Sequence, residues 1–322
     1  KNEISYLLNI SFNFIQNSSS RSSSKITLDT LCHDILNQQI IEALNLSSNI
    51  TIGSLLETSC TSTMKYNIAE ILEQEFDGIF SLPVFSESFC DEILIRHEQF
   101  SQYIQNLLNQ ENDQDVSQIA LLKLSKRSFT FSHMGLELVD QILLWITNTV
   151  SSIISPELLK NQLDWVHGYI VKYSSEHKSD SQTNDNSNKS TEHLLGAIRS
   201  GLSTHTDDSE ITANICLISG EQYSGGELIF SGMRNPSQFN QKTNNSNQQP
   251  SSTFSIKLNE RGRCVFHSGR QFHEVRSISS GLRMNAIFWF RSKSYRASLC
   301  PCCLTNNRIN PNENCICGKY WN

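Results

Sequence analysis

Charged and hydrophobic residues are both scarce in this sequence, and each shortage narrows the possible folds. Charged residues make up 18% of the 322 positions and hydrophobic residues 38%, so uncharged polar side chains fill much of the remainder. This balance predicts a folded core diluted by polar loops rather than a chain that is disordered throughout. The length suits one large domain or two modest ones.

Long apolar runs and clustered basic residues are missing as well. No stretch of about 18 apolar residues occurs, so we expect no membrane-spanning helix. Lys and Arg number 26 against 32 Asp and Glu, for a net charge of −6. This balance argues against nucleic acid as a partner, because a nucleic-acid surface needs clustered basic side chains. The chain begins with Lys1 and not with Met, which leaves a signal peptide or targeting segment open.

The ten cysteines fall into two groups. Five are scattered and are expected to be buried or free thiols of a reducing compartment, which favours the cytoplasm or nucleus and leaves the endoplasmic reticulum open. The other five lie in the last 23 residues and could supply four thiolates to Zn(II), with free or redox-active thiols as the alternative, because their spacings are tighter than the usual two-residue gap. The scattered cysteines are Cys32, Cys60, Cys90, Cys216 and Cys264, and the terminal ones are Cys300, Cys302, Cys303, Cys315 and Cys317.

In the first half of the chain, a clear helical pattern begins only after about residue 85. Residues 1–75 give mixed signals and no functional assignment. Residues 78–85 predict a short strand, and apolar residues at helical spacing over 89–107 predict a helix after it. The same spacing over 136–154 predicts a second helix. We therefore expect a helical support region at 76–160.

Past the second helix the period changes to that of strands. Residues 165–173 are aromatic and β-branched, and further strand-like runs follow without intervening helices, which predicts a sandwich or barrel over 161–296. Two polar stretches, near 174–191 and 237–252, have too little apolar area to offset ordering entropy and are expected to be surface insertions. A cysteine-rich tail follows at 297–322. The strand-like runs are 211–219, 227–230, 253–258, 263–266 and 284–290.

A candidate metal-binding motif stands at His205-Thr206-Asp207. Residues two apart at the end of a strand point to the same face, so the imidazole and the carboxylate can share an ion. Completed by a second histidine, such a pair forms the facial triad that holds Fe(II) and leaves positions open for a co-substrate and O2. Taken alone, an H-x-D pair arises most often by chance. The third ligand is expected to be His273, with His267 as its competitor.

A basic side chain that could bind an anion follows the second histidine in the sequence. Arg283 lies ten residues after His273, across a turn that contains Gly281, and we expect the turn to place Arg283 on the neighbouring strand with its guanidinium in the metal's cavity. There it can take the far carboxylate of a dicarboxylate in a bidentate pair. Asn285 shares that face and can add a hydrogen bond. Triad and basic anchor together are the minimum for binding 2-oxoglutarate at both ends.

Four separated blocks of the chain also resemble, in order, the iron(II)- and 2-oxoglutarate-dependent dioxygenases. The resemblance is to the prolyl-4-hydroxylase-like branch, and within it most to the 2-oxoglutarate and iron-dependent oxygenase domain-containing protein 2 group and its plant relatives. That group also has a segment similar to Leu-Cys-Pro-Cys-Cys at 299–303, with one residue more. The four blocks are 201–216 (GLSTHTDDSEITANIC), 225–230 (GGELIF), 263–273 (RCVFHSGRQFH) and 281–290 (GLRMNAIFWF).

The resemblance implies a fold and an activity. The fold is mainly β with flanking helices (α+β), a double-stranded β-helix (jelly roll) preceded by a helical region. The activity couples oxidative decarboxylation of 2-oxoglutarate to succinate, with O2, to hydroxylation of a substrate, with a prolyl or other protein side chain as an open candidate and L-ascorbate as an open further cofactor. The family offset to Arg283 favours His273 over His267. The residues it assigns are His205, Asp207 and His273 as iron ligands, Arg283 as the 2-oxoglutarate anchor, and Asn285, Asn214 and Tyr173 as further cavity residues.

Two other functions stay open at the level of sequence. The chain could be a catalytically silent jelly-roll binding or scaffold protein, against which the intact triad and Arg283 argue. It could also be a cupin-like metal-binding protein that uses no 2-oxoglutarate. The sequence indicates neither the substrate nor the oligomeric state.

Several residues near the motifs are assigned structural roles. His167 is expected to be a satisfied core histidine, and Asp208 a hydrogen-bonding or solvated carboxylate on the face opposite its neighbour. The short basic run of Arg291, Lys293 and Arg296 is expected to be a solvated strand end.

Overall fold

A computed structural model describes most of the chain. The predicted insertion at 237–252 and the five terminal cysteines lie outside the described residues, as does all but the start of the predicted insertion near 174–191. The described residues are 10–11, 13–16, 26–110, 116–158, 161–175, 198–234 and 253–299.

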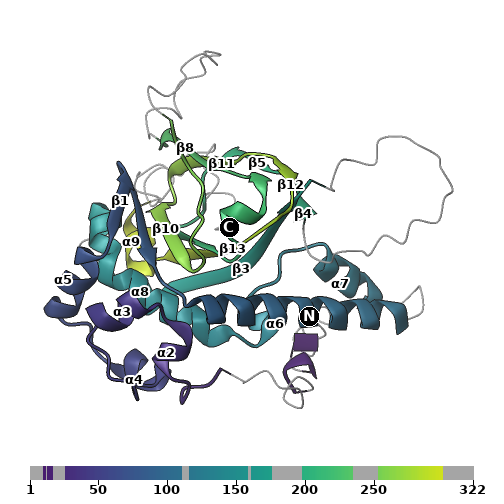
Figure 1. The fold of residues 1–322 in the computed structure, drawn as a ribbon, viewed down its shortest axis with the longest axis horizontal. Helices are drawn as coiled ribbons and strands as arrows, with labels where there is room; N and C mark the ends of the chain where they lie inside the picture. Colours follow the sequence, from purple (N-terminus) through teal and green to yellow (C-terminus); the bar gives the residue numbers. More distant parts are fainter. Residues whose placement is uncertain are drawn as a thin grey trace.

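A seven-stranded sheet forms the floor of the β region (Figure 1). Its strand pairs are antiparallel apart from the last, which is parallel. In spatial order its strands are β1 (Glu73–Phe76), β2 (Ile79–Pro83), β10 (Arg263–Ser268), β6 (Ile211–Cys216), β13 (Leu282–Arg291), β3 (Trp165–Ser174) and β4 (Ile198–Arg199).

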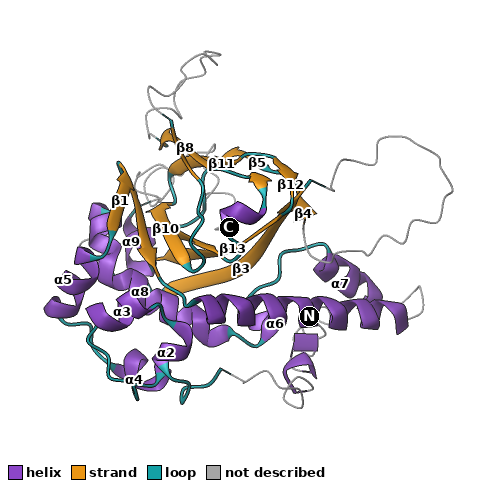
Figure 2. Ribbon diagram, in the orientation of Figure 1, coloured by secondary structure: helices purple, strands orange, loops and turns teal. Residues whose placement is uncertain are grey.

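A four-stranded antiparallel sheet faces the larger one, as Figure 2 shows. Side chains of both sheets meet in one hydrophobic cluster that contains Tyr173 and Val265 of the large sheet and Phe230 and Val275 of the small one. The predicted fold class, mainly β with flanking helices, is confirmed, and the two facing sheets have the arrangement of a double-stranded β-helix. The small sheet has the order β5 (Leu202–His205), β11 (Gln271–Val275), β8 (Leu228–Met233) and β9 (Phe254–Ile256), and a separate pair joins β7 (Ser224–Gly225) to β12 (Ile278–Ser280).

The central strands of the large sheet are buried on both faces, by an apolar core on the helix side and by a mixed polar and apolar interior on the other. Alternate residues point to opposite sides of a strand. On β13, Ala286 and Phe288 join the large core shared with the helices, whereas Arg283 and Asn285 face the interior between the sheets. Strands buried on both faces read as nearly continuous apolar runs, which is why β6 and β13 were predictable from sequence.

Two long helices pack beneath the large sheet (Figure 2). The helix predicted over 89–107 is α6 (Glu87–Gln110), and the hydroxyl of Ser86 accepts a hydrogen bond from the amide of Phe89 at its start. The helix predicted over 136–154 is α8 (Glu137–Ile154), which buries its apolar stripe. Further helices are α7 (Val116–Ser125) and α9 (Lys293–Ser298), with short 3-10 turns at Ser132–Met134, Pro156–Leu158 and Gly220–Gln222.

Short helices of the N-terminal region extend the same core. Three of them begin with a side-chain cap, in which Asn37, Thr51 or Thr61 accepts a hydrogen bond from a backbone amide. Their buried residues, including Ile40 and Ile52, belong to the cluster that contains α6, α8 and the large sheet. The predicted domain boundaries stay a prediction. The helices are α2 (Cys32–Ile35), α3 (Gln38–Ala43), α4 (Ile52–Glu57) and α5 (Ser62–Glu70).

Across the described ranges, no helix has the length and apolar character needed to cross a membrane. The cysteines Cys216 and Cys264 are buried in strands of the large sheet, as predicted. Strands β5 and β11 were not among the strand-like runs identified by sequence pattern, although the metal motif was expected at a strand end and His273 on a distant strand; both strands border the candidate site.

Candidate metal centre

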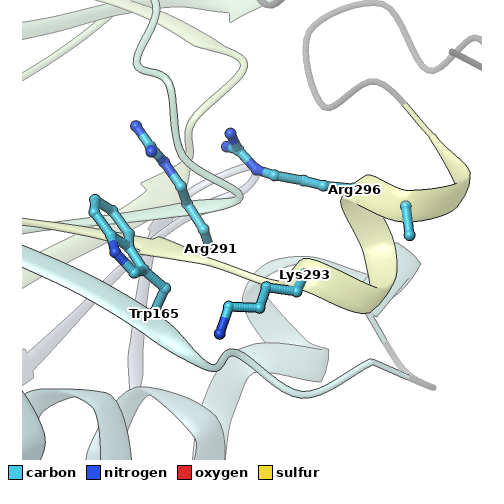
Figure 3. Close-up of a pocket in the computed structure, with 5 residues that line it drawn as sticks. Trp165, Arg291, Lys293 and Arg296 are labelled. Carbon is cyan, nitrogen blue, oxygen red and sulfur yellow. The ribbon is translucent and has the colours of Figure 1, made fainter. Parts of the chain in front are cut away.

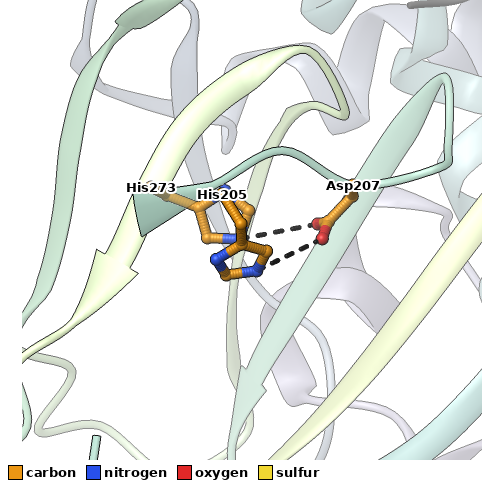
Figure 4. A group of neighbouring side chains, drawn as sticks. All are labelled: His205, Asp207 and His273. Atoms are coloured by element: carbon orange, nitrogen blue, oxygen red, sulfur yellow. Dashed lines mark ion pairs between the residues drawn. The ribbon is translucent and has the colours of Figure 1, made fainter. Parts of the chain in front are cut away.

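The structure brings His205, Asp207 and His273 together (Figure 4). One potential ligand atom of each lies within 4.8 Å of those of the others. The Nε2 atom of His205 is 3.6 Å from Oδ1 of Asp207, and the Nε2 atom of His273 is 3.6 Å from Oδ2. Two imidazoles and one carboxylate therefore converge on a single point.

Strand pairing explains why the two histidines meet. His205 ends β5 and lies directly opposite His273 of β11, so both side chains project from the same face of the small sheet. Their ring centroids are 4.2 Å apart. The two histidines are 68 positions apart in sequence, and the pairing of β5 with β11 brings them side by side.

Hydrogen bonds fix which ring nitrogen is free. The Nδ1 atom of His205 lies 2.9 Å from the carbonyl oxygen of Ser203, and that of His273 lies 3.0 Å from the carbonyl of Gln271. A carbonyl oxygen only accepts, so each Nδ1 carries the hydrogen. In the neutral ring Nε2 then keeps its lone pair, and Nε2 is the atom that faces Asp207.

Asp207 is held by the chain between the two sheets. Its amide donates to the carbonyl of Gly269 at 2.8 Å. A side chain at Gly269 would overlap the carbonyl oxygen of Ser209, so glycine is needed for this close approach. The hydroxyl of Thr212 donates to Oδ2 of Asp207 at 2.7 Å, which fixes the carboxylate. Sequence reasoning missed Thr212, although its place on the same strand face as Asn214 could have indicated it.

The competitor His267 lies deeper. It comes from β10, is fully buried, and its ring centroid is 4.6 Å from that of His273. Burial, followed by the charge of His273, lowers the pKa of His267 to about 3, so the ring is neutral at physiological pH. His267 is not part of the converging group, and its Nε2 has no hydrogen-bond partner among the described residues.

Access to the group is uneven. The side chain of His205 is 32% exposed, whereas those of Asp207 and His273 are 4% and 8% exposed. Burial lowers the pKa of His273, which favours its neutral form. Solvent and ligands can therefore reach the three side chains from the side of His205, whereas the side of Asp207 is buried in the protein.

Arg283 lies on the large sheet, opposite the small sheet that carries the two histidines, so the strand predicted for Arg283 was wrong. We expected it on the strand next to that of His273, but β13 pairs with β3 and β6 of the other sheet. The chain passes through β12 and turns at Gly281 (φ +79°), and this turn returns it to the large sheet. Arg283 still points into the interior between the sheets, because odd-numbered residues of β13 face that way.

The guanidinium of Arg283 is buried between tyrosines. It lies over the ring of Tyr173, 4.9 Å from the ring centre, and its positive charge opposes the rise that burial causes in the pKa of Tyr173 and Tyr223. Its Nη1 atom is buried and has no partner among the described residues. A buried guanidinium with an unused N–H donor destabilises the folded protein unless a hydrogen-bond acceptor pairs with that donor. Tyr223 was not predicted, since nothing in its local sequence marks it.

Two asparagines occupy the wall between Arg283 and the metal ligands. The amide of Asn285 donates to Oδ1 of Asn214 at 2.6 Å, and both side chains are buried. Asn214 lies two residues from Thr212 on the same face of β6. The predicted cavity residues Tyr173, Asn214 and Asn285 thus line the same interior as Arg283.

Two structural assignments from the sequence are wrong. The basic run is solvated only at the exposed Lys293, because Arg291 pairs with Asp208 and the buried Arg296 pairs with Asp208 and Glu210. His167 is not a core histidine either. It is half-buried in a row of rings, 5.9 Å from Trp165 and 5.5 Å from Tyr169 between centroids. Asp208 does form the hydrogen bonds expected of it.

Comparison with known proteins identifies relatives. No family model matches the chain. It is 28% identical over 233 residues to the 2-oxoglutarate and iron-dependent oxygenase domain-containing protein ICU11 of Arabidopsis thaliana, covering 71% of this chain and 49% of that protein. The 2-oxoglutarate and iron-dependent oxygenase domain-containing protein 2 of Danio rerio is 36% identical over 104 residues, or 32% of this chain and 26% of that one. The human protein of that name is 24% identical over 229 residues, or 70% and 52%.

Solved structures with some likeness include a Pseudomonas putida prolyl-4-hydroxylase, with a TM-score of 0.35 and 14% identity over 66% of this chain and 88% of that one. The carbocyclase SnoK has a TM-score of 0.40 and 12% identity over 71% and 84%. The chain spans about half the length of the two curated relatives that it matches over most of its own length. These curated relatives confirm the resemblance in sequence to the 2-oxoglutarate and iron-dependent oxygenase domain-containing proteins, including the protein 2 group.

Proposed function

We propose that this chain is an Fe(II)- and 2-oxoglutarate-dependent dioxygenase. One observation carries the proposal: two imidazole Nε2 atoms and a carboxylate converge within 4.8 Å, and a buried guanidinium with a spare donor faces the same interior. The first group suits a metal ion and the second an anion. Their combination is what a metal-chelating keto acid with a second carboxylate requires.

The converging residues suit Fe(II) by their chemistry. Two neutral imidazoles and one carboxylate form the facial donor set of non-haem iron oxygenases, which leaves positions open for other ligands. His205, Asp207 and His273 would hold the ion, and the Thr212 hydroxyl would keep Asp207 aimed at it. Bound iron supplies the redox centre for O2-dependent hydroxylation coupled to decarboxylation of the keto acid.

The far carboxylate of 2-oxoglutarate would lie at Arg283. Nη1 offers the spare donor, and Tyr173 and Tyr223 hold the guanidinium in place. The hydrophobic cluster between the sheets surrounds this end and excludes water, which strengthens a charged hydrogen bond. The residues thus bind and orient the co-substrate from both ends.

The substrate would approach from the open side of His205. Half-buried rings of Trp165, His167, Tyr169 and Trp289 lie along neighbouring strands of the large sheet, on its inward-facing side. A protein or peptide side chain is the proposed substrate, and prolyl is a candidate drawn from the family resemblance alone. Use of ascorbate stays a prediction. Zinc at the five terminal cysteines, outside the described residues, also stays a prediction.

An anaerobic titration with Fe(II) and then 2-oxoglutarate tests the proposal. We expect a visible charge-transfer band in the wild-type protein, and succinate once O2 is admitted. His205→Ala should lose both. Arg283→Ala should keep metal binding but need far more 2-oxoglutarate for the band.

The alternatives give different results in the same experiment. A cupin-like metal protein binds the metal, shows no 2-oxoglutarate band and is unaffected by Arg283→Ala. A silent scaffold makes no succinate above the level of His205→Ala. Either outcome would overturn the proposed function.

A further inference from the structure

An ion-pair network lies directly behind the metal carboxylate. Oδ2 of Asp208 is 2.8 Å from Nη2 of Arg291, and Oδ1 is 2.9 Å from Nη1 of Arg296. Nε of Arg296 is in turn 2.8 Å from Oε1 of Glu210. The other Glu210 oxygen accepts a hydrogen bond from the amide of Ser292. Two carboxylates and two guanidinium groups therefore form one connected set.

The network joins distant parts of the chain. Asp208 and Glu210 lie in the loop between β5 and β6, whereas Arg291 ends β13 and Arg296 belongs to α9. Figure 3 shows the two arginine side chains extending from these elements beside Trp165. The guanidinium of Arg291 lies 4.2 Å from the centre of the Trp165 ring, which fixes its position.

Backbone contacts continue the network to Asp207. The amide of Glu210 donates to Phe290, that of Gly269 donates to Glu210, and that of Asp207 donates to Gly269. Nε of Arg291 also donates to the backbone carbonyl of Asp208 at 2.7 Å. The loop that carries the metal carboxylate is thus held on both sides by contacts that lead to the end of β13 and to α9.

Burial makes the network sensitive to the loss of any member. The side chains of Glu210 and Arg296 are 2% and 6% exposed, whereas Asp208 is 38% exposed. Removing one partner of a buried pair leaves an uncompensated charge, which shifts the surrounding chain. A metal ligand must stay within about 0.5 Å of its productive position.

We propose that Asp208, Glu210, Arg291 and Arg296 are positioning residues that set the orientation of Asp207 for metal binding. The inference deepens the proposed function and rests on its metal site. It makes α9, which lies outside the sheets and supplies no ligand, part of the support of the metal centre. Metal affinity then depends on residues that never touch the ion.

Binding of Mn(II) alone, without 2-oxoglutarate, tests the inference in the Asp208→Asn variant of the full chain. Asp208 is the most exposed member, so the variant should melt within about 5 °C of wild type. Loss of an outer-shell contact typically weakens metal binding about 10- to 100-fold, and we expect that range for its Mn(II) Kd. Asp91→Asn is the matched control, because Asp91 pairs with Arg261 in a contact remote from the metal loop. It should leave the Kd unchanged.

The double variant Glu210→Gln/Arg296→Met separates positioning from stability. It removes both buried charges and keeps an acceptor for the Ser292 amide, so its melting temperature should stay near wild type. We expect Mn(II) binding to stay weakened. Wild-type affinity, within about threefold, in this variant and in Asp208→Asn would overturn the inference.

The outcomes distinguish this inference from the proposed function. Mn(II) binding that is strong in wild type and weakened in the variants supports the network role, even if no succinate forms. Binding that is equal in all variants overturns the network role alone. A wild-type protein that binds no Mn(II) overturns both the metal site and the network role.

Discussion

Strand β6 of the large sheet and strand β5 of the small sheet differ sharply in burial. In the large sheet, β6 is buried at every position and packs against helices on one side and the small sheet on the other. In the small sheet, β5 has no buried position, since its two middle residues are exposed and its two end residues, the second of which is His205, are half-buried. The anchor Arg283 belongs to the first sheet and the two histidines to the second. The difference indicates that the large sheet stabilises the fold, while the small sheet brings the metal ligands together.

The largest expected effect is on metal chemistry, from His273→Ala in the small sheet. We expect Fe(II) binding and succinate formation to fall to background, since one of three ligands is lost. The free energy of unfolding of the metal-free protein should fall by no more than about 2 kcal/mol. Calorimetric metal titration and urea unfolding of the same samples measure both. If His273→Ala lost much more stability than this but kept the metal affinity of wild type, the small sheet would stabilise the fold and not bind the metal, which contradicts the account.

The second effect concerns stability, from Phe288→Ala in the large sheet. Phe288 is fully buried on β13, with its ring centroid 4.8 Å from that of Phe131. Truncation should cost about 3–5 kcal/mol of unfolding free energy. The matched substitution Phe254→Ala, at a half-buried position of β9, should cost clearly less. Equal losses in urea unfolding would show that both sheets stabilise the fold alike.

The sequence predicted the large sheet better than the small one for a physical reason. Strand β13 is a nearly continuous apolar run, and its type and place were predicted. Strands β5 and β11 are short, and their sequences LSTH and QFHEV carry no clear alternation of apolar and polar residues. Their pairing depends on partners far along the chain, which no local pattern records.

The site was predictable by residue type but not by placement. His205, Asp207, His273 and Arg283 were selected by residue chemistry together with the family resemblance, and the structure brings the first three together. The sheet that carries Arg283 was predicted wrongly, because a turn at a glycine shows a reversal but not which sheet the chain joins. The partners of Asp208 lie more than 80 residues away, so its network could not be predicted.

A third effect is a pH dependence in the helix beneath the large sheet. Burial, followed by the nearby Glu137 carboxylate, raises the pKa of Asp140 to about 7. The folded state then keeps the proton that the unfolded state releases near pH 4, so stability is lost as pH rises from about 4 to 7. The full loss is at most about 4 kcal/mol. Asp140→Asn should remove this slope and be more stable than wild type at pH 8, in urea unfolding at several pH values. Parallel pH profiles for the two proteins would contradict the account.

The smallest effect is expected at the contact between the sheets. Thr212→Val removes the hydrogen bond to Asp207 and keeps the shape of the side chain. We expect about tenfold weaker Mn(II) binding, since an outer-shell partner is lost, with a change in stability of about 1 kcal/mol. Thr204→Val is the control, because Thr204 bonds Glu274 in the small sheet and not a candidate ligand. If both variants bind Mn(II) like wild type, the large sheet does not orient Asp207.

The most direct test is a crystal structure with Mn(II) and 2-oxoglutarate, with the metal located by anomalous scattering. The account predicts one ion bound by Nε2 of His205, Nε2 of His273 and a carboxylate oxygen of Asp207, with the far carboxylate of 2-oxoglutarate at Nη1 of Arg283. An ion elsewhere, or an Arg283 that contacts no co-substrate, would contradict it.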